Sequence, residues 1–245
     1  MQSKIFFFSD IDDTLIQTRR KTDFSKNTIV GAYNKEGDEN SFFYEGTKIF
    51  IDTLIDSNIA FVPTTARNIE SYKRTIFAKN SAIDKIILNF GGMILIDGKI
   101  DKDWQNQMKI EYQKIIPIKK VYDELIAEFE KNDLELVVKI IDDFYISVYN
   151  KFHLDNQAML EKLKIIMINF ANERADFYLY QNDNSFGILP NCLNKEFAVS
   201  YLIKKYNPIL TIGAGDNLTD LEFMNLTNFQ LVPNNSSIYK NRLNI

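Results

Sequence analysis

Three aspartates stand close together near the start of the chain. In KIFFFSDIDDTLI, residues 4–16, they are Asp10, Asp12 and Asp13, and they follow the apolar run of residues 5–8. That run has no helical spacing, so it predicts a strand buried on both faces. Like charges at short range repel each other, and ionised carboxylates beside a core are costly without a partner. A bound cation would remove this conflict, and so would a reaction that uses one carboxylate as nucleophile and another as proton carrier.

Other polar side chains follow later apolar runs that also predict strands. Thr65 comes after IAFVP, Asp216 lies in the turn of residues 213–216 after PILTI, and Lys195 opens the helix before that last strand. In an open α/β sheet, ligands bind outside the carboxyl ends of the strands, so we expect these groups to meet the aspartates in one crevice. Carboxylates suit Mg²⁺, whereas a hydroxyl, an ammonium and free backbone N–H groups suit phosphate oxygens.

The order of the elements explains how these groups would be brought together. Over residues 1–90, the pattern strand–helix–strand–helix–strand predicts right-handed crossovers and a parallel sheet, with a long β-hairpin or flap within residues 17–46. After residue 93 the pattern changes to helix–strand–strand, repeated once, which indicates an antiparallel α+β layer. The α/β pattern then resumes at residue 191. We therefore predict an α/β core formed by residues 1–90 and 188–245, interrupted by an inserted α+β domain of residues 91–187.

Composition and charge restrict the classes of protein that fit. The 245 residues are 45% hydrophobic, and 29 basic and 33 acidic side chains give a net charge of −4, which argues against a basic face for nucleic acid. The single cysteine, Cys192, excludes a disulfide framework and favours a reducing compartment. The apolar N-terminal run is too short for a signal peptide, and no apolar stretch approaches the ~20 residues of a membrane helix. We expect a cytoplasmic protein without nucleic-acid or membrane partners; export that leaves no N-terminal mark, and the oligomeric state, stay open.

Taken together, the motifs resemble those of a known superfamily. The order DxDxT at Asp10, a threonine at Thr65, a lysine at Lys195 and GDxxxD at Asp216 resembles the haloacid-dehalogenase-like hydrolases. The inserted domain falls between the second and third motifs, where subfamily IIB carries a cap of two helix–strand–strand units. MILIDGKIDKDW and FGILPNCLNKEFAVSYL resemble sucrose-phosphate phosphatase and related sugar-phosphate phosphatases. The resemblance implies a Rossmann-like parallel-sheet core with an inserted α+β cap, and a small phosphorylated substrate, preferably a sugar phosphate.

The resemblance also implies a role for each motif residue. Asp10 would attack phosphorus and form an aspartyl-phosphate. Asp12 would protonate the leaving oxygen and then take a proton from the hydrolytic water, and such assistance is typically worth ~10²–10⁴ in rate. Thr65 and Lys195 would hold the oxygens of the transferring phosphoryl group.

A Mg²⁺ site is implied in the same way. Asp216 would bind the ion beside the carboxylate of Asp10 and the backbone carbonyl of Asp12, and Asp220 would orient the metal shell or its waters. The sequence departs from the family at Asp13, where glycine is common. A solvated acidic turn, or two aspartates that complement a helix dipole, would show the same residues without chemistry, but here they occur together with the other motifs.

Four further side chains are predicted to contact the substrate. Arg67 either pairs with a core acid or reaches the substrate, and the inserted domain offers Lys139, Tyr145 and Gln181 at the ends of strands or hairpins. The inserted domain and the flap would set specificity by closing over the crevice and excluding water.

Three other functions share parts of this pattern. A phosphomutase of related fold would return the phosphoryl group to its substrate instead of releasing it. A phosphoprotein phosphatase would need an open crevice, which the inserted domain argues against. A non-enzymatic binding module would tolerate the loss of a motif residue, and Asp10, Asp12, Thr65, Lys195 and Asp216 are all present.

Overall fold

The computed structural model divides the chain into two compact units. Unit 1 is formed by residues 1–105 and 194–245, and unit 2 by residues 106–193. The division falls later at both ends than the predicted limits of 91 and 187. At the first limit, the strands between residues 85 and 100 form a sheet that belongs to unit 1. The residues that the structure describes are 5–57, 59–149, 157–182, 185–234 and 236–243.

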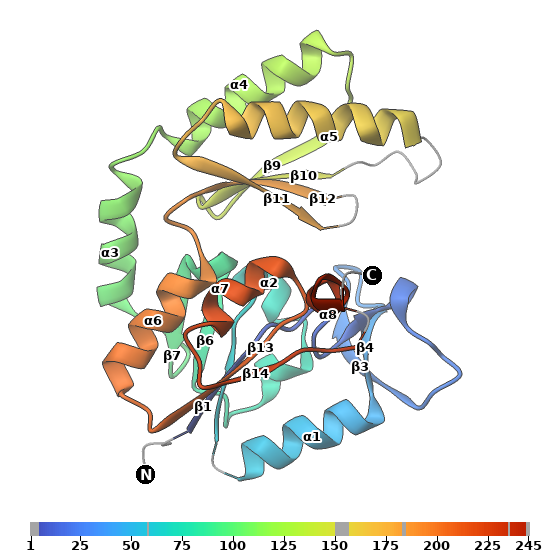
Figure 1. The fold of residues 1–245 in the computed structure, drawn as a ribbon, viewed down its shortest axis with the longest axis vertical. Coiled ribbons are helices and arrows are strands. Elements are labelled where there is room, and N and C mark those ends of the chain that lie inside the picture. The colour runs from blue at the N-terminus through green and yellow to red at the C-terminus, as the bar shows by residue number, and fades with distance from the viewer. Residues whose placement is uncertain (1–4, 58, 150–156, 183–184, 235, 244–245) are drawn as a thin grey trace. The chain divides into compact units, whose positions relative to one another are not determined.

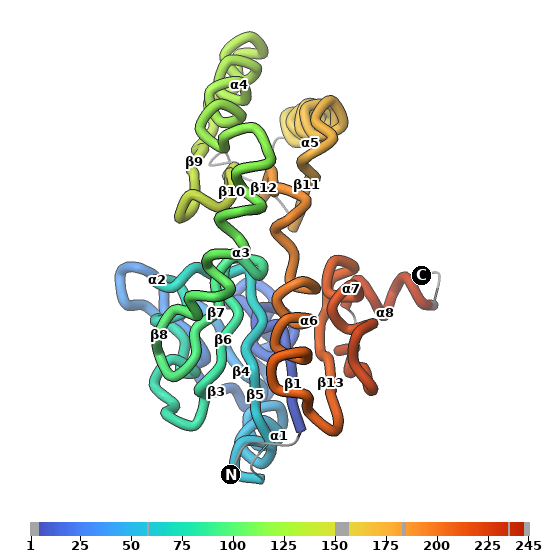
Figure 2. The backbone as a smooth tube through the Cα atoms, turned by 90° about the vertical axis from the view of Figure 1, so that its left-hand side faces the viewer, coloured from blue at the N-terminus to red at the C-terminus, as the bar shows by residue number. Residues whose placement is uncertain are grey.

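Unit 1 is built on a parallel sheet whose strand order is β14-β13-β1-β5 (Figure 1). The strands are β1 (Ile5–Ser9), β5 (Ala60–Pro63), β13 (Leu210–Ala214) and β14 (Phe229–Leu231). Figure 2 shows β1 and β13, which lie far apart in the sequence, side by side. Phe6, Phe7 and Phe8 of β1 are fully buried, as expected for a strand that is covered on both faces. The predicted parallel α/β core is therefore confirmed.

Two smaller antiparallel sheets also belong to unit 1. One contains the predicted flap and has the order β2-β4-β3, and the other has the order β6-β7-β8. A parallel bridge between Thr64 and Ile87 attaches the second sheet to the end of β5. The strands are β2 (Gln17–Thr18), β3 (Thr28–Tyr33), β4 (Glu39–Tyr44), β6 (Lys85–Leu88), β7 (Met93–Ile96) and β8 (Lys99–Ile100).

Helices connect these strands, and one of them, α3 (Lys102–Tyr112), begins in unit 1 and ends in unit 2. Among the described residues, none of the helices has the length and apolar character needed to cross a membrane. The other α-helices of unit 1 are α1 (Glu45–Asp56), α2 (Ile69–Tyr72), α6 (Lys195–Tyr206), α7 (Leu221–Met224) and α8 (Ser237–Leu243). Its 3₁₀ helices are η1 (Arg19–Lys21), η2 (Ile76–Lys79), η3 (Asn89–Gly91) and η4 (Leu218–Asp220).

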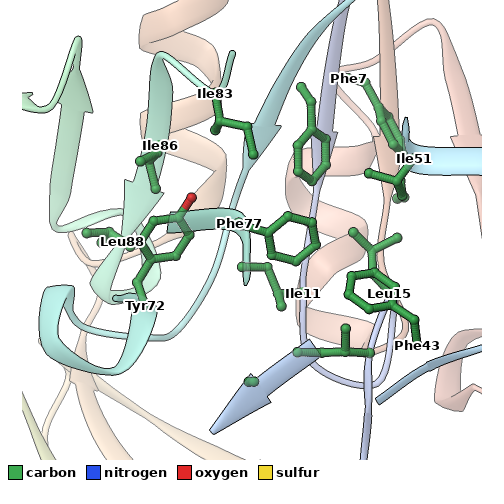
Figure 3. Close-up of a cluster of buried hydrophobic side chains, with 14 of the residues drawn as sticks. Phe7, Ile11, Leu15, Phe43, Ile51, Tyr72, Phe77, Ile83, Ile86 and Leu88 are labelled. Carbon is green, nitrogen blue, oxygen red and sulfur yellow. The ribbon is translucent and has the colours of Figure 1, made fainter. Parts of the chain in front are cut away.

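Buried side chains from several elements of unit 1 form one hydrophobic cluster (Figure 3). Phe7 comes from β1, Ile11 and Leu15 come from the segment that follows it, and Phe43 comes from the flap. Ile11 is fully buried, although both of its neighbours are aspartates. A closely packed apolar side chain between two acidic residues holds the backbone in place, so the acidic groups stay at the end of β1.

Unit 2 is an antiparallel sheet covered on one face by two helices. The strand order is β11-β12-β10-β9, and side chains of both helices, such as Leu125, Phe129 and Leu163, share a core with Ile146 of the sheet. This is the predicted pair of helix–strand–strand units. The elements are α4 (Ile118–Lys131), β9 (Val137–Ile141), β10 (Tyr145–Tyr149), α5 (Gln157–Asn172), β11 (Phe177–Asn182) and β12 (Ser185–Pro190).

Candidate active site

The carboxyl ends of β1, β5 and β13 bring three loops together at one edge of the parallel sheet. Ser9, the last residue of β1, is opposite Pro63 of β5 and Ala214 of β13. The backbone N–H of Asp10 donates to the Ala214 carbonyl at 2.9 Å, and that of Thr64 donates to the Ser9 carbonyl at 2.7 Å. Because hydrogen bonding continues past the strands, each loop starts from a fixed backbone position.

A buried lysine joins two aspartates that come from different loops. Lys195 Nζ lies 2.7 Å from Asp10 Oδ1 and 2.7 Å from Asp220 Oδ1, and all three residues are buried. Lys195 is the first residue of α6, and the side chain of Asn194 caps this helix by accepting a hydrogen bond from the N–H of Glu196. The cap fixes where α6 begins, and therefore the position from which Lys195 reaches the carboxylates.

Thr14 links the carboxylate of Asp10 to that of Asp216. Its hydroxyl oxygen lies 3.2 Å from Asp10 Oδ2 and 3.1 Å from Asp216 Oδ1. A hydroxyl carries one proton, so it can donate to only one of the two carboxylates at a time. Sequence reasoning missed this role of Thr14; its place in the first motif, shortly after Asp10, is the signal that could have found it.

The turn after β13 is held by the side chain of Asp220. Its Oδ2 accepts hydrogen bonds from the backbone N–H groups of Asp216, at 3.3 Å, and Asn217, at 3.1 Å. Gly215 approaches Asp220 so closely that a Cβ atom at position 215 would lie 2.4 Å from the Cβ of Asp220. Both carboxylate oxygens of Asp220 are thus engaged, one by Lys195 and one by the turn, which fits a residue that orients its neighbours.

Carboxylate groups outnumber cations in this cluster. Oxygens of Asp10, Asp216 and Asp220 lie within 4.8 Å of one another. Burial raises the pKa of Asp10 well above its usual value; Lys195 lowers it, and the other carboxylates raise it again. Burial, with the charges of Asp220 and Asp13, raises the pKa of Asp216 to about 7. Burial lowers the pKa of Lys195, but Asp10 and Asp220 raise it by more, so the ammonium stays charged.

This donor set fits a divalent cation. Carboxylate oxygens are hard ligands of the kind that Mg²⁺ takes in proteins, and a bound ion would favour the ionised forms that burial disfavours. Asp10 and Asp216, both predicted as ligands, belong to the cluster together with Asp220. The side chain of Asp12 is not part of it among the described residues, and a role for the Asp12 backbone carbonyl stays a prediction.

The carboxylate of Asp12 faces an arginine from the loop after β5. Arg67 donates from Nε to Asp12 Oδ2 at 2.6 Å and from Nη2 to Asp12 Oδ1 at 2.7 Å. Burial lowers the pKa of Arg67, but the charge of Asp12 raises it by more, so the guanidinium stays ionised. Of the two roles predicted for Arg67, pairing with an acid is the one that the structure contains.

Thr65 lies in the same loop and is fully buried. Its N–H donates to the carbonyl of Ile87 at 2.9 Å, and its hydroxyl accepts from the N–H of Arg67 at 3.1 Å. These bonds fix the loop at the end of β5. That the Thr65 hydroxyl holds a phosphoryl oxygen stays a prediction.

Asp13 has a backbone conformation that favours glycine. Its φ angle is +61°, in the left-handed region that glycine adopts without steric cost. The Asp13 carboxylate pairs with Lys21, whose Nζ lies 2.6 Å from Oδ2. A partner for its charge is therefore supplied from the segment that leads into the flap.

Three of the predicted substrate contacts lie in unit 2. Lys139 of β9 is opposite Ser147 of β10, and Tyr145 lies two residues before Ser147, so Lys139 and Tyr145 share one face of the sheet. Gln181 of β11 is opposite Phe186, whose side chain is in the core beneath the helices. The sheet thus brings Lys139 and Tyr145 together and places Gln181 on the other face.

A family model matches almost the entire chain. It describes sucrose-6F-phosphate phosphohydrolase and matches residues 3–237. The chain belongs to this family. It is therefore a haloacid-dehalogenase-like phosphatase, as the motifs indicated, and its reaction class is phosphoric monoester hydrolysis.

Solved structures that share the fold of this phosphatase include other sugar-phosphate phosphatases. The sucrose-phosphatase of Synechocystis sp. PCC6803, in complex with sucrose and phosphate, is 16% identical, with a TM-score of 0.59 over 98% of this chain and 86% of that chain. The C-terminal domain of the C. albicans trehalose-6-phosphate phosphatase is 15% identical, with a TM-score of 0.57 over 91% of this chain and 73% of that chain. At these identities the likeness concerns the fold. A comparison with curated proteins gives no match.

Proposed function

We propose that this phosphatase hydrolyses a small sugar phosphate, with Mg²⁺ and through an aspartyl-phosphate on Asp10. The observation that carries the proposal is the cluster at the end of β1, where Lys195 contacts Asp10 and an oxygen of Asp216 lies within 4.8 Å of the Asp10 carboxylate. Membership of the sucrose-6F-phosphate phosphohydrolase family supports a sugar ester as the substrate.

Asp10 is the proposed nucleophile because a buried carboxylate there is held next to a permanent positive charge. It must be ionised to attack, and the ammonium of Lys195 at 2.7 Å favours that form. In the first step a bond forms between an Asp10 oxygen and phosphorus, and the bond between phosphorus and the ester oxygen breaks. The departing oxygen takes a proton from Asp12.

In the second step, water releases the phosphoryl group. Asp12 takes a proton from the water, the water oxygen bonds to phosphorus, and the bond from phosphorus to Asp10 breaks. Inorganic phosphate leaves and Asp10 is restored. Thr65 and Lys195 hold the phosphoryl oxygens in both steps, because a hydroxyl and an ammonium both donate hydrogen bonds to them.

Asp10 and Asp216 would hold the Mg²⁺ ion, and Asp220 would keep the turn that carries Asp216 in place. When bound, the ion supplies positive charge that offsets the negative charge of the phosphoryl oxygens. The acidic cluster supports this assignment, since its carboxylates have more negative charge than Lys195 balances.

Unit 2 is the proposed cap that selects the sugar. Lys139 and Tyr145, on one face of its sheet, offer an ammonium and a phenolic hydroxyl, which hydrogen-bond well to sugar hydroxyls. In this proposal Arg67 takes no part in selecting the sugar, and its guanidinium pairs with Asp12 instead.

Product analysis with a panel of sugar phosphates, nucleotides and phosphopeptides tests the proposal. We expect release of inorganic phosphate with the highest kcat/KM on a sugar phosphate, in the presence of Mg²⁺. Conversion of a sugar phosphate to an isomer without free phosphate would identify a phosphomutase instead. Preferred hydrolysis of phosphopeptides would overturn the sugar assignment.

A further inference from the structure

The carboxylate of Asp12 is fixed by a two-point contact. Nε and Nη2 of Arg67 bind the two oxygens of Asp12 separately, at 2.6 and 2.7 Å, so the plane of the carboxylate is set as well as its distance. The Arg67 side chain is 14% exposed and that of Asp12 is 32% exposed. Asp12 is thus accessible enough to exchange a proton, while the arginine that holds it is largely shielded from water.

Arg67 is itself held at three points. Its backbone N–H donates to the Thr65 hydroxyl at 3.1 Å, and its carbonyl accepts from the N–H of Asn89 at 2.9 Å. At the far end of the side chain, Nη1 donates to the carbonyl of Ser71 at 3.0 Å. The direction of the guanidinium is therefore set by the loop and by α2, and it does not depend on a bound substrate.

Fixed direction matters for an acid that must also act as a base. Asp12 would have to meet the leaving oxygen in one step and a water molecule in the next, and a displacement of about 1 Å can reduce a rate by ~10²-fold. An unheld aspartate moves among several side-chain rotamers. A planar arginine contact removes that freedom, whereas a lysine could offer only a point charge.

We propose that Arg67 is a positioning residue for Asp12: it fixes the carboxylate that protonates the leaving oxygen and deprotonates the attacking water. This inference rests on the proposed function, and it does not require Arg67 to touch the substrate. Direct binding of the phosphoryl group is the competing role for Arg67, and the two roles differ in their dependence on the leaving group.

The test compares kcat/KM for a sugar phosphate and for 4-nitrophenyl phosphate in Arg67→Met. This constant covers the steps up to formation of the aspartyl-phosphate. A sugar alkoxide needs a proton to leave and nitrophenolate does not, so we expect a loss of ~10²-fold on the sugar phosphate and little change on the aryl phosphate. Unchanged aryl phosphate kinetics also show that the variant is folded. Arg67→Lys keeps the positive charge but cannot make the planar two-point contact. It should show a smaller loss of kcat/KM on the sugar phosphate, again with little change on the aryl phosphate.

A double-mutant cycle separates action through Asp12 from action on the phosphoryl group. With Asp12→Asn already in place, Arg67→Met should cause no further loss on the sugar phosphate, because the group that it positions is gone. Arg74→Met is the matched control, since Arg74 donates to the carbonyl of Glu70 in the neighbouring helix; it should leave the ratio of the two kcat/KM values unchanged.

Equal losses on both substrates that multiply with those of Asp12→Asn would overturn the inference and assign Arg67 to phosphoryl binding. Unchanged kinetics on both substrates would also overturn the inference, because Arg67 would then have neither role. Failure of the proposed function would look different: the wild-type protein would release no phosphate, or Asp10→Asn would remain active, whatever residue occupies position 67.

Discussion

The acidic cluster around Lys195 and the Asp12–Arg67 pair both lie near the carboxyl end of β1, but they differ in how their charge is balanced. Around Lys195, three carboxylates share one ammonium among the described residues, and the lysine and two of its acidic neighbours are buried. Asp12, by contrast, is about a third exposed and has the guanidinium of Arg67 bound to both of its oxygens. A one-to-one pair is electrically complete, whereas the cluster keeps an excess of negative charge that burial makes unfavourable.

Because of this difference, the two groups are suited to different roles. The unbalanced cluster is suited to receive a cation and, with it, a phosphate ester, because binding removes the excess charge. The balanced pair has no charge to be satisfied, so it is suited to holding one carboxylate in a fixed position. A change that disturbs one of these groups should leave the other intact.

The largest effect is expected from Asp10→Asn. The change keeps the shape of the side chain but removes the nucleophilic oxygen anion, and loss of a nucleophile typically lowers kcat by ~10⁴–10⁶-fold. Phosphate release from a sugar phosphate measures the effect. Asp52→Asn, in α1 and with a half-exposed side chain, is the control and should retain normal turnover. Turnover by Asp10→Asn at the wild-type rate would contradict the covalent step.

Removal of metal should be the next largest effect. EDTA should lower kcat by roughly 10³-fold, because a bound cation contributes several kcal/mol to stabilising the charge of a transferring phosphoryl group. Added Mg²⁺ should restore activity. Full activity in chelator would mean that the excess charge of the cluster has another purpose.

Substituting the positively charged side chain of each group should destabilise the metal-free protein to different extents. Lys195→Met leaves buried carboxylates without their positively charged partner and should lower the free energy of unfolding by about 3–5 kcal/mol. Arg67→Met leaves the Asp12 carboxylate without its partner, but water can partly reach this carboxylate. The free energy of unfolding should therefore fall by only about 1–3 kcal/mol. Lys48→Met, which breaks a partly exposed pair with Asp52 on the surface of unit 1, should change the free energy of unfolding by about 0–1 kcal/mol. Urea unfolding in EDTA measures all three, and equal losses for Lys195 and Arg67 would erase the distinction between the two groups.

The last prediction concerns pH. In the folded, metal-free protein the pKa of Asp10 is raised, and that of Asp216 is raised to about 7. The pKa of an aspartate in the unfolded chain is about 3.9. At pH values between the unfolded and folded pKa, the folded protein therefore binds more protons than the unfolded chain. Its stability should therefore fall as pH rises from about 4 to 7. Thermal unfolding should show a larger stabilisation by Mg²⁺ at pH 8 than at pH 5.5. The same stabilisation at both values would count against a metal bound by these carboxylates.

The sequence predicted the positions of the carboxylates better than their partners. Asp10 and Asp216 could be assigned to one edge because each follows an apolar run that had to be a strand, and parallel strands end together. The contact of Arg67 with Asp12 depends on the path of an irregular loop, for which the sequence has no periodic signal. Gln181 was grouped with the other polar residues of the insert, but strand register turns it to the opposite face, and a shift of one residue would reverse that.

The limits of the two units could not be read from the change of pattern alone. The strands β6, β7 and β8 form one antiparallel sheet, whereas we expected β6 in the parallel core and the strands after residue 93 in the insert. A backbone bond from the Thr65 N–H to the Ile87 carbonyl, and the bridge beside it, join β6 to the loop after β5 in unit 1. Such long-range pairing is set by the tertiary structure, so composition and periodicity do not reveal it.

Trapping the reaction during turnover tests the central claim most directly. Acid quenching with a sugar phosphate and Mg²⁺ present, followed by peptide mass spectrometry, should find a phosphoryl group on Asp10. The label should increase in Asp12→Asn supplied with 4-nitrophenyl phosphate, because the second step then lacks its base, and it should be absent in Asp10→Asn. Steady release of phosphate with no label at position 10, or with the label on another residue, would contradict the account.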